Sequence, residues 1–246
     1  MGHIKDIKIL WNICNKNCAE WNKTILNIGS VLKYYVDKPQ NGVFTAKMAD
    51  IYNGYKTINK RFYLNDNIVQ KLVYGGFMSV LKGDSQTLSI SFKNDYVAEM
   101  LCNPGRLLEL YTLMIGATIE QAGVRFFDDC DSSVVIDWKN DKNNLSDIDR
   151  DVLNEIDVMF TKNMTPVFIS CKNGFFDAEE LYKLSVVADR FGGKYAKKIL
   201  VTTYFEPDVS FIRRANELGK TIISNVDKLS YRKYSDKLCD AVNKKI

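Results

Sequence analysis

The sequence predicts an α/β fold: a mixed sheet flanked by helices, preceded by a small winged-helix-like α+β domain. In the C-terminal part, strand-like apolar runs alternate with amphipathic helices. In the N-terminal part, helical patterns are followed by two short strands. The segment Cys102-Asn103-Pro104-Gly105 separates these parts, because proline and glycine favour turns. We therefore expect a first domain at residues 1–102 and a second at 103–246.

The elements of the first domain are predicted in chain order. Apolar residues recur at helical spacing from 7 to 36. Thr45 is a candidate N-cap for a short helix through Tyr52, and Asn65 or Asp66 for another that ends at Gly75-Gly76. Two strands follow, at 77–81 and 87–92. Three helices and a hairpin are typical of winged-helix domains, which bind DNA or pack against a partner.

The second domain begins with a helix predicted from Arg106 to Ala122, which is apolar almost all round. Its narrow polar stripe is either a solvated edge or part of a functional site; it comprises Glu109, Thr112, Gly116 and Glu120. Strands are expected at 124–127 and 132–138. After a hairpin come a helix at 178–191, a strand at 199–204, a helix opened by Pro207, a strand at 221–224 and a final helix. Strands joined through helices imply parallel pairing.

The hairpin at residues 154–173 carries the most informative residues. Its strands flank a polar turn at 161–164. Because side chains alternate along a strand, Glu155 and Asp157 share one face of the first strand, and Ser170 and Lys172 share one face of the second. A group of charges on an otherwise apolar hairpin indicates paired charges or a metal site.

Composition narrows the possible chemistry. Among 246 residues there is a single histidine, His3, which excludes catalysis by Ser-His-Asp or Cys-His sets. Acid, base and metal-binding roles therefore fall to Asp, Glu, Lys and Tyr. The sequence has neither a run of membrane-spanning length nor a signal peptide, so we expect a cytoplasmic protein without a membrane partner.

Basic residues concentrate in the last quarter of the sequence, where Lys194 and Lys197 belong to the excess. The net charge is only +4, which neither requires nor excludes nucleic acid. This concentration is either a solvated surface or a track for phosphates.

The order of elements resembles the PD-(D/E)XK nucleases, which have a restriction-endonuclease-like fold. The segments NEIDV, PVFISCKNG, DAEELYKL, RFGG and LVTT resemble the nuclease domain of the CRISPR-associated Card/Can-type effectors. Those proteins carry a cyclic-oligoadenylate-sensing Rossmann domain, a winged-helix-like linker and this nuclease. The resemblance covers the linker and the nuclease, and we expect the sensor domain to be absent here.

The resemblance assigns roles to individual residues. Asp157 matches the metal-binding aspartate, Lys172 the catalytic lysine, and Glu109 the acid of the first helix. Ser170 departs from the family, which often has a carboxylate there, and a hydroxyl is a poor ligand for Mg²⁺ or Mn²⁺. We infer that Glu155 supplies the missing charge.

The resemblance implies a metal-dependent endonuclease of antiviral defence that cuts single-stranded or supercoiled DNA, or RNA. Tyr182 and Lys183 are expected to contact phosphate. Glu180 is expected to cap its helix, at the capping-box position after Asp177. Two alternatives stay open. One is a catalytically silent nuclease-like module that binds nucleic acid or a protein, favoured by Ser170; the other is a winged-helix regulator.

The expected partners besides nucleic acid are proteins. Trp11, Trp21, Ile25, Leu32 and Tyr35 form a large apolar face near the N-terminus. Such a face either covers the domain's own core or binds a partner. We expect a homodimer, or association with a separate sensor protein, through it.

Overall fold

The computed structural model describes residues 2–15, 43–47, 67–81, 87–102, 105–136, 154–173, 176–203 and 208–244. It divides into two compact units, residues 1–107 and 108–246. The division describes compact units and says nothing of what each unit does. The linker and nuclease roles expected for the two predicted domains therefore stay predictions.

The first unit contains helices and a small antiparallel sheet. Its described helices are α1 (Gly2–Asn15), α5 (Asn67–Tyr74) and α6 (Asp95–Cys102). Its strands are β1 (Val43–Lys47), β2 (Met78–Leu81) and β3 (Thr87–Phe92), in the order β1-β3-β2. An ion pair of 2.8 Å joins Lys93 Nζ to Asp6 Oδ2 and ties α1 to the end of β3. The two strands at 78–81 and 87–92 are confirmed.

Three features of this unit differ from expectation. Thr45 is not a helix cap: it lies within β1 and pairs with Ser89, because the run Val43-Phe44-Thr45 suits a strand. Helix α1 begins before residue 7, and residues 16–36 of the expected helix lie outside the described residues. Helix α6 was not predicted, although the Asn94 side chain caps it by accepting a hydrogen bond from Val97 N. The helix expected after residue 47 also lies outside the described residues, so the winged-helix assignment stays a prediction.

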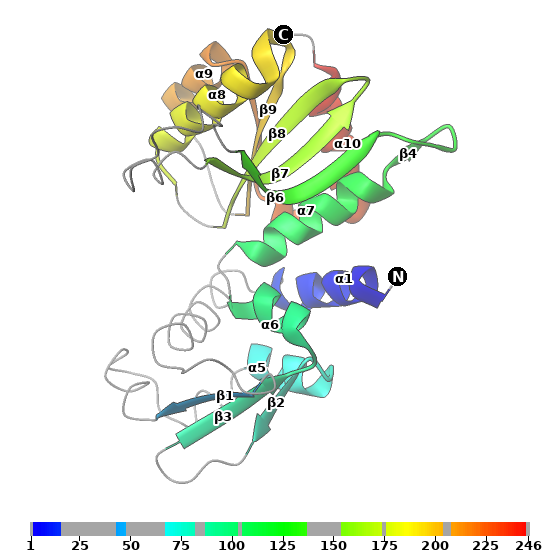
Figure 1. The fold of residues 1–246 in the computed structure, drawn as a ribbon, viewed down its shortest axis with the longest axis vertical. Coiled ribbons are helices and arrows are strands. Elements are labelled where there is room, and N and C mark those ends of the chain that lie inside the picture. The colour runs from blue at the N-terminus through cyan, green and yellow to red at the C-terminus, as the bar shows by residue number, and fades with distance from the viewer. Residues whose placement is uncertain are drawn as a thin grey trace, which may run out of the picture. The chain divides into compact units, whose positions relative to one another are not determined.

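The second unit is built on a five-stranded mixed sheet with strand order β10-β9-β8-β7-β6 (Figure 1). Strands β6 (Asp129–Ile136), β7 (Asn154–Lys162) and β8 (Thr165–Lys172) are antiparallel neighbours. Strands β9 (Lys197–Thr202) and β10 (Lys220–Ile223) continue the sheet in parallel with β8. The predicted mixed α/β sheet, with the charged hairpin in its antiparallel part, is confirmed.

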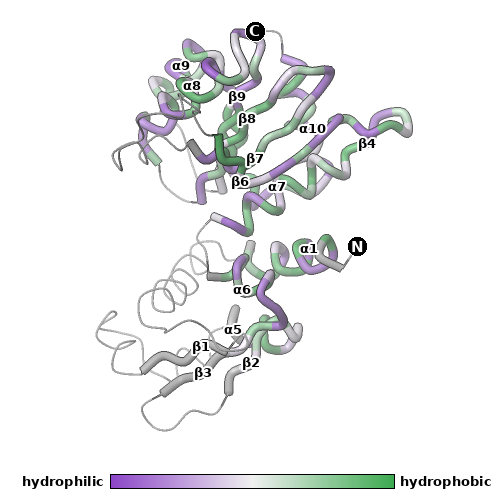
Figure 2. Tube along the Cα trace, in the orientation of Figure 1, coloured by the Kyte–Doolittle hydropathy of each residue, from purple (hydrophilic) through white to green (hydrophobic). Residues whose placement is uncertain are grey.

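Helices cover both faces of this sheet. Helices α8 (Glu179–Gly192) and α9 (Val209–Glu217) lie on one face, and α7 (Arg106–Thr118) and α10 (Tyr231–Asn243) lie on the other (Figure 1). The core on the α8 side includes Ile156, Phe168, Leu184 and Ala188. Figure 2 shows hydrophobic residues along β8 and β9, inside the sheet. Burying both faces of these strands explains their nearly continuous apolar sequences.

Helix α7 ends four residues earlier than predicted. A small hairpin follows it, made of β4 (Glu120–Gln121) and β5 (Val124–Arg125). Its turn places Ala122 at φ 51° and Gly123 at φ 78°, and the left-handed region is one that glycine adopts at little cost. Glu120 therefore lies in a strand rather than on the helix.

The central hairpin has a tighter turn than predicted. Only Asn163 and Met164 lie between the strands, and both have positive φ, 48° and 64°. Positive φ at both central residues is the geometry of a two-residue turn whose twist matches the strands. The turn fixes the register that places Asp157 across from Ser170, just beyond the Val158–Ile169 pair.

Candidate active site

The hairpin strands separate at Asp157. Their residue pairing runs from Lys162–Thr165 to Val158–Ile169 and ends there. Beyond it, Asp157 Oδ2 accepts a hydrogen bond from the backbone N–H of Cys171 at 2.6 Å and one from Ser170 Oγ at 3.2 Å. The carboxylate thus takes the place of a backbone acceptor and holds the two strands in a fixed, opened arrangement.

Burial dominates the electrostatics of Asp157. Removal from water raises the pKa of this carboxyl, and the negative charge of Glu155 adds to the effect. The hydrogen bond from Cys171 N, the charge of Lys172 and the Ser170 hydroxyl act in the opposite direction. Both of these hydrogen bonds go to Oδ2, and no hydrogen bond to Oδ1 is found among the described residues. Asp157 is therefore anchored through one oxygen, and the residue also lines the pocket described next.

An open pocket of about 620 Å³ adjoins Asp157. Its base includes apolar side chains of the α8-side core, among them Ile156 and Leu184. Its polar lining comes from β7, β8 and the first two turns of α8: Glu155, Asp157, Ser170, Lys172, Glu179, Glu180, Tyr182 and Lys183. A concave site with an apolar base and a few convergent charges is the usual form of a ligand pocket.

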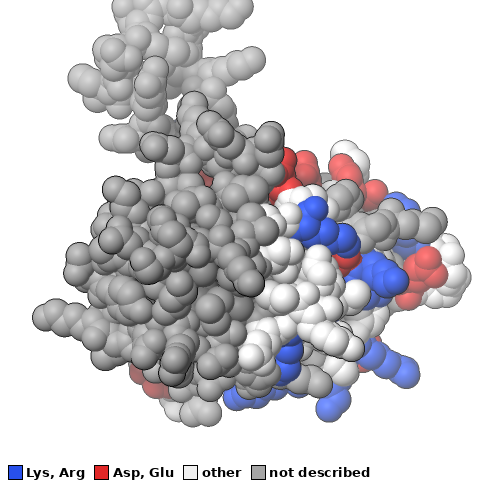
Figure 3. Space-filling model, turned by 90° about the horizontal axis from the view of Figure 1, so that it is seen from below, with Lys and Arg blue, Asp and Glu red and all other residues white. Residues whose placement is uncertain are grey.

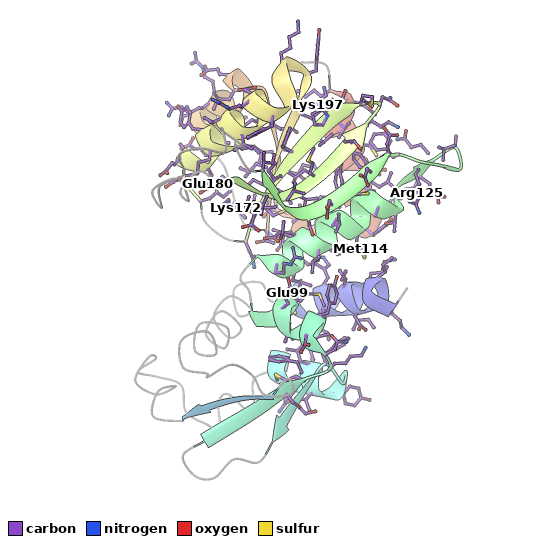
Figure 4. All side chains as sticks on the ribbon, in the orientation of Figure 1. Glu99, Met114, Arg125, Lys172, Glu180 and Lys197 are labelled. Carbon is purple, nitrogen blue, oxygen red and sulfur yellow. The ribbon has the colours of Figure 1, made fainter. Side chains whose placement is uncertain are left out.

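Lys172 is paired with Glu180 inside this pocket. Its Nζ lies 2.6 Å from Glu180 Oε2, and the two side chains are 31% and 23% exposed. Figure 4 labels both residues at the same end of the sheet. Glu180 was expected to be a helix cap, which is wrong: its carboxylate contacts lysines, while Asp177 Oδ1 accepts the hydrogen bond from Glu179 N. The capping-box spacing thus led to a wrong prediction for Glu180, which lines the pocket instead.

The pocket brings together most of the residues predicted from the sequence. Its lining includes Asp157, Glu155, Ser170 and Lys172, together with Tyr182 and Lys183 of the expected phosphate contacts. Lys183 also pairs with Glu179 at 3.0 Å, and Tyr182 lies under the Arg214 guanidinium at 6.0 Å. Whether these residues carry the predicted roles stays a prediction.

Glu109, Lys194 and Lys197 do not line this pocket. Glu109 lies on α7, on the other side of the sheet, where its charge raises the pKa of Cys171. Lys194 lies over the Tyr195 ring at 4.8 Å, and Lys197 Nζ donates to Lys244 O at 2.6 Å. Both lysines follow the C-terminal end of α8, a helix length of roughly 20 Å away from the residues of its first turn.

The surface view shows how charges are distributed. On the one face drawn in Figure 3, Lys and Arg are interspersed with Asp and Glu across the described residues. Lys and Arg therefore form no continuous track on the described part of that face.

The side of β8 that faces away from the pocket is buried and neutral. Thr112 Oγ1 donates to Leu108 O at 2.8 Å and lies 2.7 Å from Tyr234 Oη. Cys171 Sγ lies 3.8 Å from the same Thr112 oxygen. Burial raises the pKa of Cys171 well above its ordinary value, so this thiol stays protonated and is a poor nucleophile or metal ligand. Thr112 and Gly116, two members of the polar stripe of α7, are both buried. At these positions the stripe is therefore not a solvated edge.

Carboxylate oxygens, the ligands that hard divalent cations prefer, are present in the pocket. Asp157 and Glu155 both line it, and no described residue donates a hydrogen bond to Oδ1 of Asp157. Mg²⁺ keeps several waters and is usually bound through one or two carboxylates together with substrate phosphate. No group of three or more His, Cys, Asp or Glu side chains arranged to hold a metal is found in the described part of the chain. A cation held by Asp157 and Glu155 would therefore take its remaining ligands from water or substrate.

Comparisons with known proteins agree on the fold. No protein-family model and no curated protein matches the sequence. Among solved structures, the crystal structure of protein VC1899 from Vibrio cholerae matches with a TM-score of 0.65 and 19% identity over 96% of this chain. The structure of Can2 from Sulfobacillus thermosulfidooxidans in complex with cyclic tetra-adenylate matches with a TM-score of 0.53 and 15% identity over 95%.

The chain spans little more than half the length of these two proteins, 57% of VC1899 and 55% of Can2. At these identities the likeness is one of fold, and the chain shares it along nearly its whole length. Within the described residues, no helix is long and apolar enough to cross a membrane.

Proposed function

We propose that the pocket between β7, β8 and α8 hydrolyses phosphodiester bonds of nucleic acid, DNA or RNA, with Mg²⁺ or Mn²⁺. The observation that carries this proposal is that Asp157 and Lys172, the residues that the PD-(D/E)XK resemblance selects, line one pocket at the point where the hairpin opens. The likeness of fold to Can2 supports a Card/Can-type effector of CRISPR-associated antiviral defence.

The roles of the residues follow from their charges and positions. Asp157 and Glu155 would hold the divalent cation, which when bound lowers the pKa of a coordinated water and neutralises phosphate charge. Lys172 would contact a phosphate oxygen or orient the attacking water, and developing negative charge would be stabilised by its ammonium group. Ser170 would act by holding the Asp157 carboxylate rather than as a metal ligand.

A metal-binding or catalytic role for Glu109 has less support than the resemblance implies. It belongs to α7 and is not among the residues that line the pocket. We therefore propose Asp157 and Lys172 as the central residues, with Tyr182 and Lys183 as contacts to the nucleic-acid strand. A homodimer, and a separate sensor protein that responds to a cyclic oligoadenylate, are proposed partners.

A second candidate function is a catalytically silent nuclease-like module that binds nucleic acid or a protein. Two observations favour it: Ser170 stands where the family often has a carboxylate, and Lys172 is already paired with Glu180. The third alternative, a winged-helix regulator, has less support. Helix α5, which precedes the hairpin as a recognition helix does in winged-helix domains, carries Lys71 as its single basic residue.

Cleavage by defined variants tests the proposal. With Mg²⁺ or Mn²⁺, the parent protein should cut single-stranded or supercoiled DNA, or RNA. Asp157→Asn and Lys172→Ala should each lower the rate more than about a hundredfold, as expected if each contributes a few kcal/mol to the barrier. Asp177→Asn and Lys228→Ala, charge changes outside the pocket lining, serve as controls. Unchanged cleavage by both pocket variants in highly purified protein would refute a nuclease site here.

A further inference from the structure

Glu180 lies between two ammonium groups in the candidate active site. Its Oε2 is 2.6 Å from Lys172 Nζ, and its Oε1 is 3.5 Å from Lys183 Nζ. Both lysines line the pocket, and they come from different elements, β8 and α8. The two oxygens of one carboxylate thus each face a different cation.

Two lysines placed in this way could also bind the phosphate group of a phosphodiester. Its two non-bridging oxygens share one negative charge, as the two oxygens of a carboxylate do, and lysine binds phosphate as a point charge. A pair of lysines that can hold a carboxylate in this way can hold a phosphodiester in its place. The position of Glu180 therefore marks an anion subsite.

We propose that Glu180 is an internal anion that occupies the phosphate subsite formed by Lys172 and Lys183, and that a substrate phosphate must displace it. This inference rests on the proposed function, since it names how access to that site is controlled. Glu180 then acts as a gate on binding, because each phosphate that enters exchanges one ion pair for another.

The surroundings of Glu180 allow such an exchange. The residue lies in the first turn of α8, is partly exposed, and can reach water by a change of side-chain rotamer. Lys183 keeps a partner when Glu180 moves away, because Glu179 Oε1 lies 3.0 Å from its Nζ. Lys172 has no second ion pair with a described residue. The replacement of Glu180 by phosphate at Lys172 therefore determines how tightly phosphate binds.

Glu179 provides a matched control. It is the neighbouring acid of the same helical turn, it also lines the pocket, and it pairs with Lys183, but no ion pair joins it to Lys172. A general effect of removing negative charge would appear in Glu179→Gln as well as in Glu180→Gln. An effect that depends on Lys172 would be much larger in Glu180→Gln, because only Glu180 pairs with that lysine among the described residues.

Binding of a short fluorescent single-stranded DNA oligonucleotide, measured by anisotropy in the presence of EDTA, tests the proposal without cleavage. Glu180→Gln should bind about tenfold more tightly than the parent protein, the size expected for loss of one charged competitor. Glu179→Gln releases Lys183 alone and should tighten binding only about twofold, within the range of exposed pairs. In a Lys172→Ala background, adding Glu180→Gln should give no further gain.

Titration with inorganic phosphate, followed by NMR of the lysine side chains, is a second readout that needs no nucleic acid. The Lys172 signals should respond to phosphate in Glu180→Gln at lower concentrations than in the parent protein. Equal or weaker binding of both probes by Glu180→Gln would overturn the proposal, and so would a gain that survives Lys172→Ala. A gain in affinity without cleavage by any variant would refute the nuclease and leave the anion subsite supported.

Discussion

The two sides of β8 differ sharply at its last residues. On the pocket side, Ser170 and Lys172 belong to a group of partly exposed charges and hydroxyls that includes Asp157 and Glu180. On the opposite side, Cys171 is buried against Thr112, which bonds to Tyr234. One side thus carries groups able to bind ions, and the other carries neutral groups that satisfy one another.

The difference shows how the fold supports the pocket. The backbone N–H of Cys171 donates to Asp157, so a residue whose side chain belongs to the core positions a carboxylate of the pocket. Packing of α7 and α10 against the buried side therefore fixes the strand whose backbone holds Asp157. We expect changes on the buried side to alter stability, and changes on the pocket side to alter binding.

The same sheet also holds a buried lysine that has no counter-charge paired with it among the described residues. Lys220 of β10 is 1% exposed, and its Nζ has no hydrogen-bond partner in the described structure. Burial, with the charge of neighbouring Lys198, lowers the pKa of Lys220 from 10.5 to about 8. The unfolded chain therefore holds this proton more tightly than the native state, and the cost to stability grows as the pH falls from 10.5 to about 8.

Lys220→Met should accordingly raise the free energy of unfolding by about 3 kcal/mol at neutral pH. The gain should shrink as the pH rises and vanish above the ordinary lysine pKa of 10.5. Denaturant unfolding over a range of pH measures it, with Lys228→Met at an exposed position as the control. A gain in the free energy of unfolding that does not depend on pH would show that the pKa of Lys220 is not lowered in the folded protein.

The buried side is tested at Gly116 of α7. A methyl group added there would collide with the Phe160 ring of β7, so Gly116 permits the close approach of this helix to the sheet. Gly116→Ala should destabilise the protein by about 2 kcal/mol, because overpacking outweighs the gain in helix propensity. Ala117→Gly, at the next position, should cost about 1 kcal/mol from propensity alone. A stabilising Gly116→Ala would contradict the packing described for this side.

The pocket side is tested by moving carboxylates, which should produce smaller effects on binding. Ser170→Asp should tighten Mn²⁺ binding and Glu155→Gln should weaken it, each by about three- to tenfold, since hard cations prefer carboxylate oxygens. Glu179→Gln is the control, because Glu179 is engaged with Lys183. If Glu155→Gln binds Mn²⁺ like the parent protein, Glu155 does not compensate for Ser170.

The sequence allows much of the second unit to be predicted, for reasons visible in its residues. Apolar β-branched runs and glycine-ended helices predict the order of β7, β8, α8 and β9, and strand alternation predicts that Asp157, Ser170 and Lys172 meet. The contact of Glu180 with Lys172 could not be predicted, because it depends on how α8 packs over β8 and not on spacing within either element. The burial of Thr112 was missed for the same reason, since its partners Tyr234 and Cys171 are far away in the sequence.

Calorimetric titration of the protein with Mn²⁺ separates the nuclease from the silent module, because the two differ in metal binding. The carboxylates of Asp157 and Glu155 in the pocket predict a Mn²⁺ site in the parent protein. This site should be lost in Asp157→Asn, whose amide oxygen can still accept the hydrogen bond from Cys171 N and preserve the fold. Absence of Mn²⁺ binding by the parent protein, or unchanged binding by folded Asp157→Asn, would rule out a metal-dependent nuclease at this pocket.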